Sequence, residues 1–329
     1  MPEISVIIPM YHPPKLSFRR CLDSLIEQTY TDFEVIVVED GFQEGYEHII
    51  DEYKKRDDRI RFFCPNHGGV AAARNYGMKA ASGKYISFVD SDDFIDPSFL
   101  TEMRQAMNDA DVAICAISEQ YHPVYPGWTD RRIFFSKPSA YNGLQYINYC
   151  HNKLFRADLI RENNLQFPEG VEQGEDALFV ASYLDCCQRF RMVREPRYHY
   201  VWEESSAMQK YQPSFWHWEQ KVMDTQRALF SQYPLSNFER QAMEHWVYSK
   251  LNYAFSYYMR REKNFKIKRA KIAEICHTDT FAYLRKVKLR NHRHLNRKER
   301  YVLLLWKLFG GCGVWMAEYG KKVYKKLAR

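Results

Sequence analysis

The sequence lacks several patterns that would assign a protein class at once. Its eight cysteines form no C-x-x-C pair and show no metal-finger spacing, which argues against a zinc-stabilised domain. The apolar run at the N-terminus follows no basic segment, and Pro9 and Pro13 interrupt it, so we expect neither a signal peptide nor a membrane span there. No G-x-G-x-x-G follows that run, which argues against a dinucleotide-binding enzyme. We therefore expect a cytoplasmic catalytic part whose thiols stay reduced in the core.

The chain does contain enough apolar material for a folded core, and its charge is unevenly distributed. Apolar residues make up 46% of the 329 residues and aromatic residues 16%, as in globular proteins. Residues 260–329 hold 21 Lys and Arg against five Asp and Glu, whereas residues 1–259 hold 27 against 36. This asymmetry predicts an acidic catalytic body and a basic tail that seeks an anionic surface. We expect one domain over residues 1–210 and a helical region over residues 211–329.

Apolar runs alternate with segments of helical periodicity through the first ninety residues. Ile4–Ile8 is a β-branched run ended by Pro9, which is typical of a strand buried on both faces. Because the pattern repeats with helix-length connections, it predicts an α/β fold with a mainly parallel, doubly wound sheet. The expected strands are 4–8, 33–38, 60–64 and 85–89, and the expected helices are 15–29, 46–57 and 69–81.

Acidic side chains follow the expected strands, at the edge where such sheets bind ligands. After the strand that ends near Val89, Asp90 and Asp92 form a D-x-D motif. Carboxylate oxygens at this spacing can share one Mg²⁺ or Mn²⁺ and leave positions open for phosphate oxygens. The alternative is that Ser91 or an aspartate caps a helix over residues 94–107.

Glu39 and Asp40 end the second expected strand, just before Gly41. An Asx-type turn would account for Asp40 and Gly41, but it leaves Glu39 unexplained. A carboxylate at this place could accept a hydrogen bond from a base imide or a ribose hydroxyl. Acidic groups brought together from separate strand ends repel one another unless a cation compensates, so a divalent metal is the simplest explanation.

Five segments, taken in their order and spacing, resemble glycosyltransferase family 2, whose members are inverting enzymes of the GT-A fold. They are ISVIIPMY, CLDSLIEQTYTDFEVIVVEDG, GGVAAARNYGMKAASGKYISFVDSDD, NKLFRADLI and GEDALF. The resemblance extends from Ile4 to about Met208, close to two thirds of the chain. It implies a GT-A domain with a C-terminal helical extension, and transfer of a sugar from a nucleotide diphosphate, expected to be a UDP-sugar, to an acceptor hydroxyl.

The resemblance also implies roles for individual residues. The metal would be held by Asp90 and Asp92, with His199 completing its coordination or touching phosphate. Relatives more often have Asp where Glu39 stands, which leaves the choice of uridine less well defined. A surface or helix-packing arginine at position 74 and a satisfied structural histidine at position 199 are the alternatives. The implied donor-binding residues are Pro9, Tyr11, Glu39, Asp40, Arg74, Asp90 and Ser91.

By the same resemblance, Asp176 matches the catalytic base and Glu175 stands beside it; an acidic helix N-terminus is the alternative. Attack requires the acceptor hydroxyl to lose its proton, so a carboxylate is needed on the acceptor side. The expected reaction is one displacement with inversion, in which the metal neutralises the leaving diphosphate. The enzyme would be a metal-dependent hexosyl- or N-acetylhexosaminyltransferase. Lys153 matches a recurrent lysine for which no role follows.

The last third of the chain predicts helices over residues 215–233, 237–259 and 265–276. Residues 301–315 are strongly apolar but interrupted by Lys307 and by glycines, and basic residues flank them, among them Lys321–Lys326. A span needs about 20 apolar residues, so we expect this stretch to lie in the interface of an anionic membrane. An amphipathic helix packed on the domain is the alternative. Docking would suit a bacterial enzyme on the inner face of the cell membrane, with a lipid-linked or cell-surface polysaccharide precursor as acceptor.

Two other functions compete with transfer. A catalytically silent nucleotide- or glycan-binding module would keep the sheet, but the D-x-D motif together with Glu175 and Asp176 favours a working enzyme. A nucleotidyltransferase would share the sheet and the metal, but the glycine-rich basic loop expected after its first strand is absent. Nothing besides charge supports nucleic-acid binding, so we expect no nucleic-acid partner.

Overall fold

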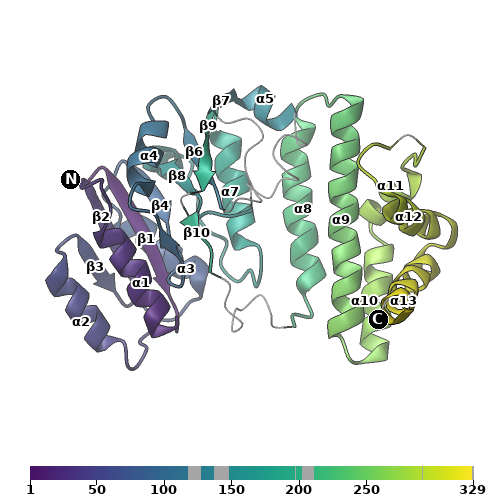
Figure 1. The fold of residues 1–329 in the computed structure, drawn as a ribbon, viewed down its shortest axis with the longest axis horizontal. Coiled ribbons are helices and arrows are strands. Elements are labelled where there is room, and N and C mark those ends of the chain that lie inside the picture. The colour runs from purple at the N-terminus through teal and green to yellow at the C-terminus, as the bar shows by residue number, and fades with distance from the viewer. Residues whose placement is uncertain (118–126, 137–147, 197, 202–210, 291, 328–329) are drawn as a thin grey trace. The chain divides into compact units, whose positions relative to one another are not determined.

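The computed structural model divides into two compact units (Figure 1). The first consists of Met1–Ser206 with Asp224–Tyr233, and the second of Ala207–Met223 with Pro234–Arg329. The C-terminal part of α8 (Phe215–Ser231) thus belongs with the first unit. The structure describes residues 1–117, 127–136, 148–196, 198–201, 211–290 and 292–327.

The first unit is built on a sheet with the strand order β3-β2-β1-β4-β8-β6-β9-β7. Its first four strands in the chain pair in parallel, which confirms the predicted doubly wound pattern. β8 lies between β4 and β6 and runs antiparallel to both, which the sequence did not indicate. The strands are β1 (Ile4–Met10), β2 (Phe33–Glu39), β3 (Ile60–Phe63), β4 (Tyr85–Phe88), β6 (Val112–Ala116), β7 (Gly127–Asp130), β8 (Lys153–Arg156) and β9 (Arg189–Pro196).

Apolar side chains bury both faces of the central strands. Alternate residues of β1, beginning at Ile4, join a core cluster with residues of α1, α2 and α4. Ile7, between them, meets α3, and a Cβ atom on Gly77 would lie only 2.4 Å from Ile7 Cγ2. Glycine at this position therefore lets α3 approach the sheet closely. These helices are α1 (Lys15–Ile26), α2 (Glu47–Arg56), α3 (Val70–Ala80) and α4 (Phe99–Ala106).

The expected helix over residues 94–107 is wrong at its start. Residues Phe94–Ile95 form β5, which pairs antiparallel with β10 (Tyr198–His199), and α4 begins only at Phe99. Pro97 explains the delay, because a proline disfavours helical geometry in the residue before it. Ser91 and the aspartates beside it therefore do not cap α4. The remaining helices of this unit are α5 (Arg131–Ser136), α6 (Ala157–Glu162) and α7 (Glu175–Cys186).

The second unit is helical, as the sequence predicted for the C-terminal region. The apolar stretch 301–315 is divided between α12 and α13, because Gly310 has a φ of 53° and ends α12. No described helix is long and apolar enough to cross a bilayer. Besides the first part of α8, the helices are α9 (Asn237–Arg261), α10 (Phe265–Cys276), α11 (Asp279–Lys286), α12 (Arg297–Phe309) and α13 (Gly311–Leu327).

The cysteines only partly follow the expectation of core thiols. All eight are free. Cys64 and Cys312 are exposed, and Cys186 and Cys276 are partly buried. The buried four are Cys21, Cys115, Cys150 and Cys187.

Candidate active site

The ends of β1 and β2 lie side by side and carry the first group of predicted donor-binding residues. Met10 pairs with Glu39 in the parallel register, and the Glu39 carboxylate is 6% exposed and accepts a 2.7 Å hydrogen bond from the Gln43 backbone N–H. Pro9 is buried within β1, opposite Val38. Tyr11, just beyond the strand, is 59% exposed and its ring stacks on His67 at 5.2 Å. An exposed aromatic side chain therefore follows the residue that pairs with Glu39.

Asp40 orders the loop that leads into α3. Its carboxylate accepts hydrogen bonds from the backbone N–H groups of Gly68, at 2.7 Å, and Gly69, at 3.0 Å. His67 Nδ1 lies 2.9 Å from Asp40 Oδ2. Gly41 has a φ of 78°, as the predicted turn requires. Asp40 thus has a structural role here, and a role toward ribose stays a prediction.

Arg74 brings together the acidic residues that follow β4 and begin α7. Its guanidinium is 4% exposed and lies 2.9 Å from Asp90, 3.0 Å from Glu175 and 2.5 Å from Asp176. The arginine projects from α3, the helix that Gly77 holds against the sheet. Segments far apart in the sequence therefore meet at one buried positive charge. Arg74 is therefore not a surface arginine, and a role toward the diphosphate stays a prediction.

The two aspartates of this cluster differ in proton affinity. Burial would raise the pKa of Asp90, but the charge of Arg74 and the nearby His151 ring outweigh it and hold that pKa well below its ordinary value. At Asp176, burial dominates over the opposing charge of Arg74, and Glu175 adds repulsion, so its pKa rises to about 7. Asp90 is thus a permanent carboxylate, whereas Asp176 can take up and release a proton near neutral pH.

Asp93 and His199 belong to a neighbouring group of contacts. The Asp93 carboxyl accepts a 2.7 Å hydrogen bond from the Tyr198 hydroxyl and a 2.8 Å bond from the Val201 backbone N–H. Burial, and then the charge of Asp90, raises the pKa of Asp93 to about 8. His199 Nε2 lies 2.6 Å from Asp96 Oδ1, and its ring stacks on Phe94 at 4.4 Å. In the described contacts His199 therefore has Asp96 as its partner rather than the D-x-D carboxylates.

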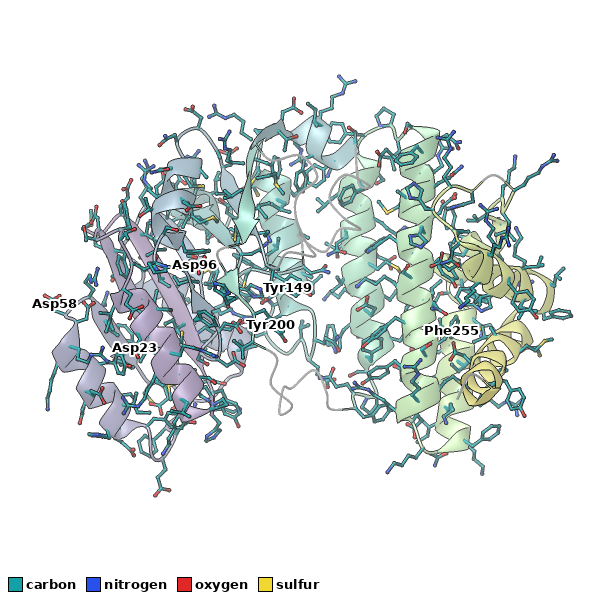
Figure 2. All side chains as sticks on the ribbon, viewed as in Figure 1. Asp23, Asp58, Asp96, Tyr149, Tyr200 and Phe255 are labelled. Carbon is teal, nitrogen blue, oxygen red and sulfur yellow. The ribbon has the colours of Figure 1, made fainter. Side chains whose placement is uncertain are left out.

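His151 is a site residue that the sequence reasoning missed. It is 3% exposed, its Nδ1 lies 3.5 Å from Asp90 Oδ2, and neither ring nitrogen has a hydrogen-bond partner within the described residues. Its ring stacks between Tyr149 and Tyr198 at 5.1 and 4.3 Å; Figure 2 labels Tyr149 and, close to it, Tyr200. The antiparallel register of β8 with β4, in which Leu154 faces Ser87, carries His151 to the level of Asp90. Nothing in the local spacing signals this pairing.

Lys153 and Cys150 line the buried side of the same cluster. Lys153 is fully buried, and its ammonium donates to Asn152 Oδ1 at 2.8 Å and to the Tyr149 carbonyl at 2.5 Å. Burial lowers the pKa of Lys153 to about 7. Cys150 Sγ donates to Asp176 Oδ2 at 3.4 Å. Lys153 is thus withdrawn from solvent.

Comparison with known proteins identifies the family. The family model described as "Glycosyl transferase family 2" matches residues 5–163. The uncharacterized glycosyltransferase EpsJ of Bacillus subtilis is 31% identical over 248 residues, which are 72% of each chain. The chain belongs to glycosyltransferase family 2. The minor teichoic acid biosynthesis protein GgaB of Bacillus subtilis is 29% identical over 63% of this chain and 24% of its own length.

Solved structures support the GT-A-like fold of this family 2 member. TarS 1–349 of S. aureus, in complex with UDP-GlcNAc, superposes with a TM-score of 0.70 at 19% identity, covering 97% of this chain and 91% of TarS 1–349. The mannosyltransferase PcManGT of Pyrobaculum calidifontis, in complex with GDP-Man and Mn²⁺, gives a TM-score of 0.52 at 14% identity over 99% of this chain and 88% of its own. At these identities the likeness concerns the fold.

The donor atoms at the family 2 D-x-D motif suit a hard divalent cation. Asp90 stays ionised and its side chain is 26% exposed, and Asp92 stands two residues further, partly exposed. Carboxylate oxygens of this kind are the ligands that Mg²⁺ and Mn²⁺ prefer. Among the described residues no three His, Cys, Asp or Glu side chains are already arranged around a metal position. Arg74 is the cation in contact with Asp90.

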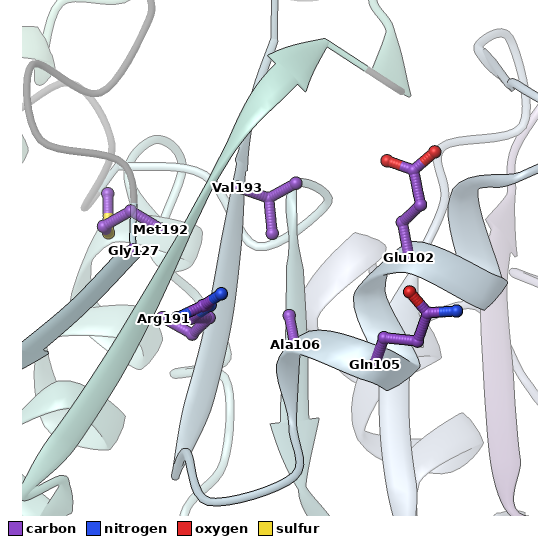
Figure 3. Close-up of a pocket in the computed structure, with 7 residues that line it drawn as sticks. All are labelled: Glu102, Gln105, Ala106, Gly127, Arg191, Met192 and Val193. Atoms are coloured by element: carbon purple, nitrogen blue, oxygen red, sulfur yellow. The ribbon is translucent and has the colours of Figure 1, made fainter.

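A separate hollow lies in the first unit (Figure 3). Its volume is about 670 Å³, and α4, β7 and β9 line it. None of its lining residues is among the predicted site residues. They are Glu102, Gln105, Ala106, Gly127, Arg191, Met192 and Val193.

Proposed function

We propose that this chain transfers a sugar from a nucleoside diphosphate donor, expected to be a UDP-sugar, to an acceptor hydroxyl with inversion at the anomeric carbon. The cluster in which Arg74 holds Asp90 and Asp176 carries this proposal. Asp90 is a carboxylate that stays charged, and the pKa of Asp176 is about 7. A charged carboxylate can hold the metal that assists departure of the diphosphate, and a carboxylate with a pKa near 7 can act as the general base.

The donor would occupy the edge formed by β1, β2 and β4. The exposed Tyr11 ring and the buried Glu39 carboxylate are suited to a base, with Pro9 behind them and Asp40 toward the ribose. Arg74 and Ser91 would face the diphosphate. A UDP donor is supported by the TarS complex with UDP-GlcNAc, which shares the fold, and we extend this to a hexosyl or N-acetylhexosaminyl group.

Asp90 and Asp92 would hold a Mn²⁺ or Mg²⁺ ion, which when bound supplies positive charge to the leaving diphosphate. Arg74 contacts Asp90 and would turn toward the diphosphate oxygens when the donor binds. His199 would contact the metal or a phosphate only after its Nε2 leaves Asp96.

Asp176 would act as the base, with Glu175 beside it at the start of α7. Its oxygen takes the acceptor hydroxyl proton while that hydroxyl oxygen bonds to the anomeric carbon and the bond to the donor phosphate oxygen breaks. A pKa of about 7 leaves a large fraction of Asp176 ionised at neutral pH and still basic enough to accept the proton. One displacement completes the reaction, without a covalent sugar on the protein.

The acceptor is proposed to be a lipid-linked or cell-surface polysaccharide precursor, made in a reducing cytoplasm. Two observations support this proposal. The similar protein GgaB is named for minor teichoic acid biosynthesis, and all eight cysteines of this chain are free.

A thermal-shift screen of UDP-glucose, UDP-galactose, UDP-GlcNAc and GDP-mannose, with and without Mn²⁺, tests the donor. A ligand that binds only the folded state raises the melting temperature, so we expect a UDP-sugar to do so only with the metal, and Asp90→Asn to remove the shift. Mass spectrometry then follows UDP release. A donor that binds without transfer or hydrolysis would favour a silent binding module. Pyrophosphate release from a nucleoside triphosphate and a sugar phosphate would favour a nucleotidyltransferase.

A further inference from the structure

Helix α12 carries apolar side chains on two opposite sides. Successive residues of an α-helix are about 100° apart. Its inner side is buried in the second unit through Val302, Leu303, Leu305 and Trp306. On the opposite side Tyr301 is 61%, Leu304 41% and Leu308 64% exposed. The spacing of three and four residues aligns these three side chains in one stripe.

The exposed stripe is not needed to hold the helix in place. The inner side already anchors it, and a capping box formed by Asn296 and Glu299 fixes its start. A helix that packs by one side ordinarily has a polar outer side. When neighbouring apolar side chains are exposed on that outer side, they indicate an interaction surface. Phe309, at the end of α12, is a further exposed one, at 50%.

Cations border the stripe, and no acidic side chain of α12 itself is exposed. Of the five Asp and Glu in residues 260–329, Glu262 and Glu318 are buried, and Glu274 and Asp279 are exposed but lie on α10 and α11. Glu299 is partly buried and is engaged by the Asn296 backbone and by His245. By the helical spacing, Arg297 precedes Tyr301 on the same stripe, and it is exposed.

Two more cations border the stripe at fixed positions. The Arg300 guanidinium donates to the carbonyls of Leu295 and His292, and Lys307 Nζ donates to the carbonyl of Val287. Both stay partly exposed. Exposed apolar side chains bordered by cations at fixed positions match the chemistry of a bilayer with anionic head groups. Side chains from residue 321 onward lie outside the described ones.

We propose that the outer face of α12, defined as Arg297, Tyr301, Leu304 and Leu308, docks on an anionic membrane surface. The two leucines enter the boundary between head groups and acyl chains, the tyrosine ring lies at head-group level, and Arg297 pairs with lipid phosphate. The helix lies in the plane of the interface and does not cross. This proposal is independent of the donor and of transfer activity.

Vesicle sedimentation of the full chain tests the proposal. We expect pelleting with vesicles of phosphatidylglycerol and phosphatidylcholine in equal parts, weak pelleting with phosphatidylcholine alone, and release as salt rises, because the electrostatic part is screened. Replacing Tyr301, Leu304 and Leu308 together by Ser should lower the partition coefficient about tenfold or more, given the apolar area lost from the bilayer.

Leu16→Ser is the matched control, because Leu16 is 83% exposed on α1 of the first unit, and it should pellet like the wild type. Circular dichroism melting should show the triple variant as stable as the wild type, since the changed side chains are exposed. Equal pelleting of the triple variant, or no pelleting of the wild type with anionic vesicles, would overturn the proposal. So would a dimer in analytical ultracentrifugation that the triple variant loses, because a second copy would then cover this face.

Discussion

Arg74→Met is the substitution whose effect the structure defines most sharply. Methionine keeps an unbranched apolar side chain of similar length but removes the positive charge. Asp90, Glu175 and Asp176, which lie 2.5 to 3.0 Å from the guanidinium, would then face one another without a counter-charge. We expect the sheet unit to lose stability because three acidic groups cannot all stay ionised in this setting.

The size of the loss follows from burial. The Arg74 side chain is 4% exposed, and removing one partner of a buried ion pair costs about 3–5 kcal/mol. For a domain of this size each kcal/mol lowers the melting temperature by about 2–4 °C, so we expect a drop of roughly 6–20 °C. Arg56→Met is the matched control: it breaks a 2.9 Å pair with Asp23 in which the side chains are 43% and 41% exposed, and exposed pairs contribute only about 0–1 kcal/mol.

The loss should also depend on pH. In the wild type the pKa of Asp90 lies below its ordinary value, so its pairing stabilises the fold above the unfolded-state pKa and the effect fades as pH falls. In the variant, burial raises the pKa values of the carboxyls, so the folded state binds more protons than the unfolded state and gains stability as pH falls. Urea denaturation at several pH values should show that the difference in free energy of unfolding between the wild type and the variant becomes smaller from about pH 8 to pH 5. The electrostatic account would be refuted if the variant lost less than about 1 kcal/mol of unfolding free energy, or if its difference from the wild type grew at acidic pH.

Three further predictions concern the reaction. Asp176→Asn should bind the donor with unchanged affinity in calorimetry but slow transfer by about 10²- to 10⁴-fold; near-normal turnover would exclude Asp176 as the base. Because the Asp176 carboxyl must be ionised to accept a proton and its pKa is about 7, kcat/KM should rise with pH below about 7 and level off above it. A profile that is flat across neutral pH contradicts this role. Removing divalent ions with a chelator should abolish heat of donor binding, and Mn²⁺ should restore it; an unchanged Kd after chelation would show that Asp90 and Asp92 hold no required metal.

The first four strands and the helices between them could be predicted closely. Ile4–Ile8 was predicted as a strand and β1 covers Ile4–Met10; Phe33–Val38 was predicted and β2 covers Phe33–Glu39. Parallel strands covered on both faces consist of continuous apolar runs, so their signal is local and strong. The start of α4 was misjudged, since the apolar residues Phe94 and Ile95 pair with β10, more than a hundred residues later.

The site was accessible from sequence only where a motif follows a strand. Asp90, Asp92 and Glu39 follow predicted strands, and Glu175 and Asp176 came from the family resemblance. His151 could not be found, because its place next to Asp90 depends on the antiparallel pairing of β8 with β4. The pKa of Asp176 depends on its depth and on Arg74, which no spacing reveals.

The reversed direction of β8 has a consequence for how specificity can change. Asp90 and the other residues of the D-x-D segment follow β4 at its C-terminal end. Because β8 runs antiparallel to β4, its N-terminal end lies at the same edge, and the residues there, Cys150 and His151, precede β8. The two walls of the Arg74 cluster thus come from segments with separate connections. Substitutions ahead of β8 can therefore reshape one wall while the D-x-D segment and the strand before it keep their backbone.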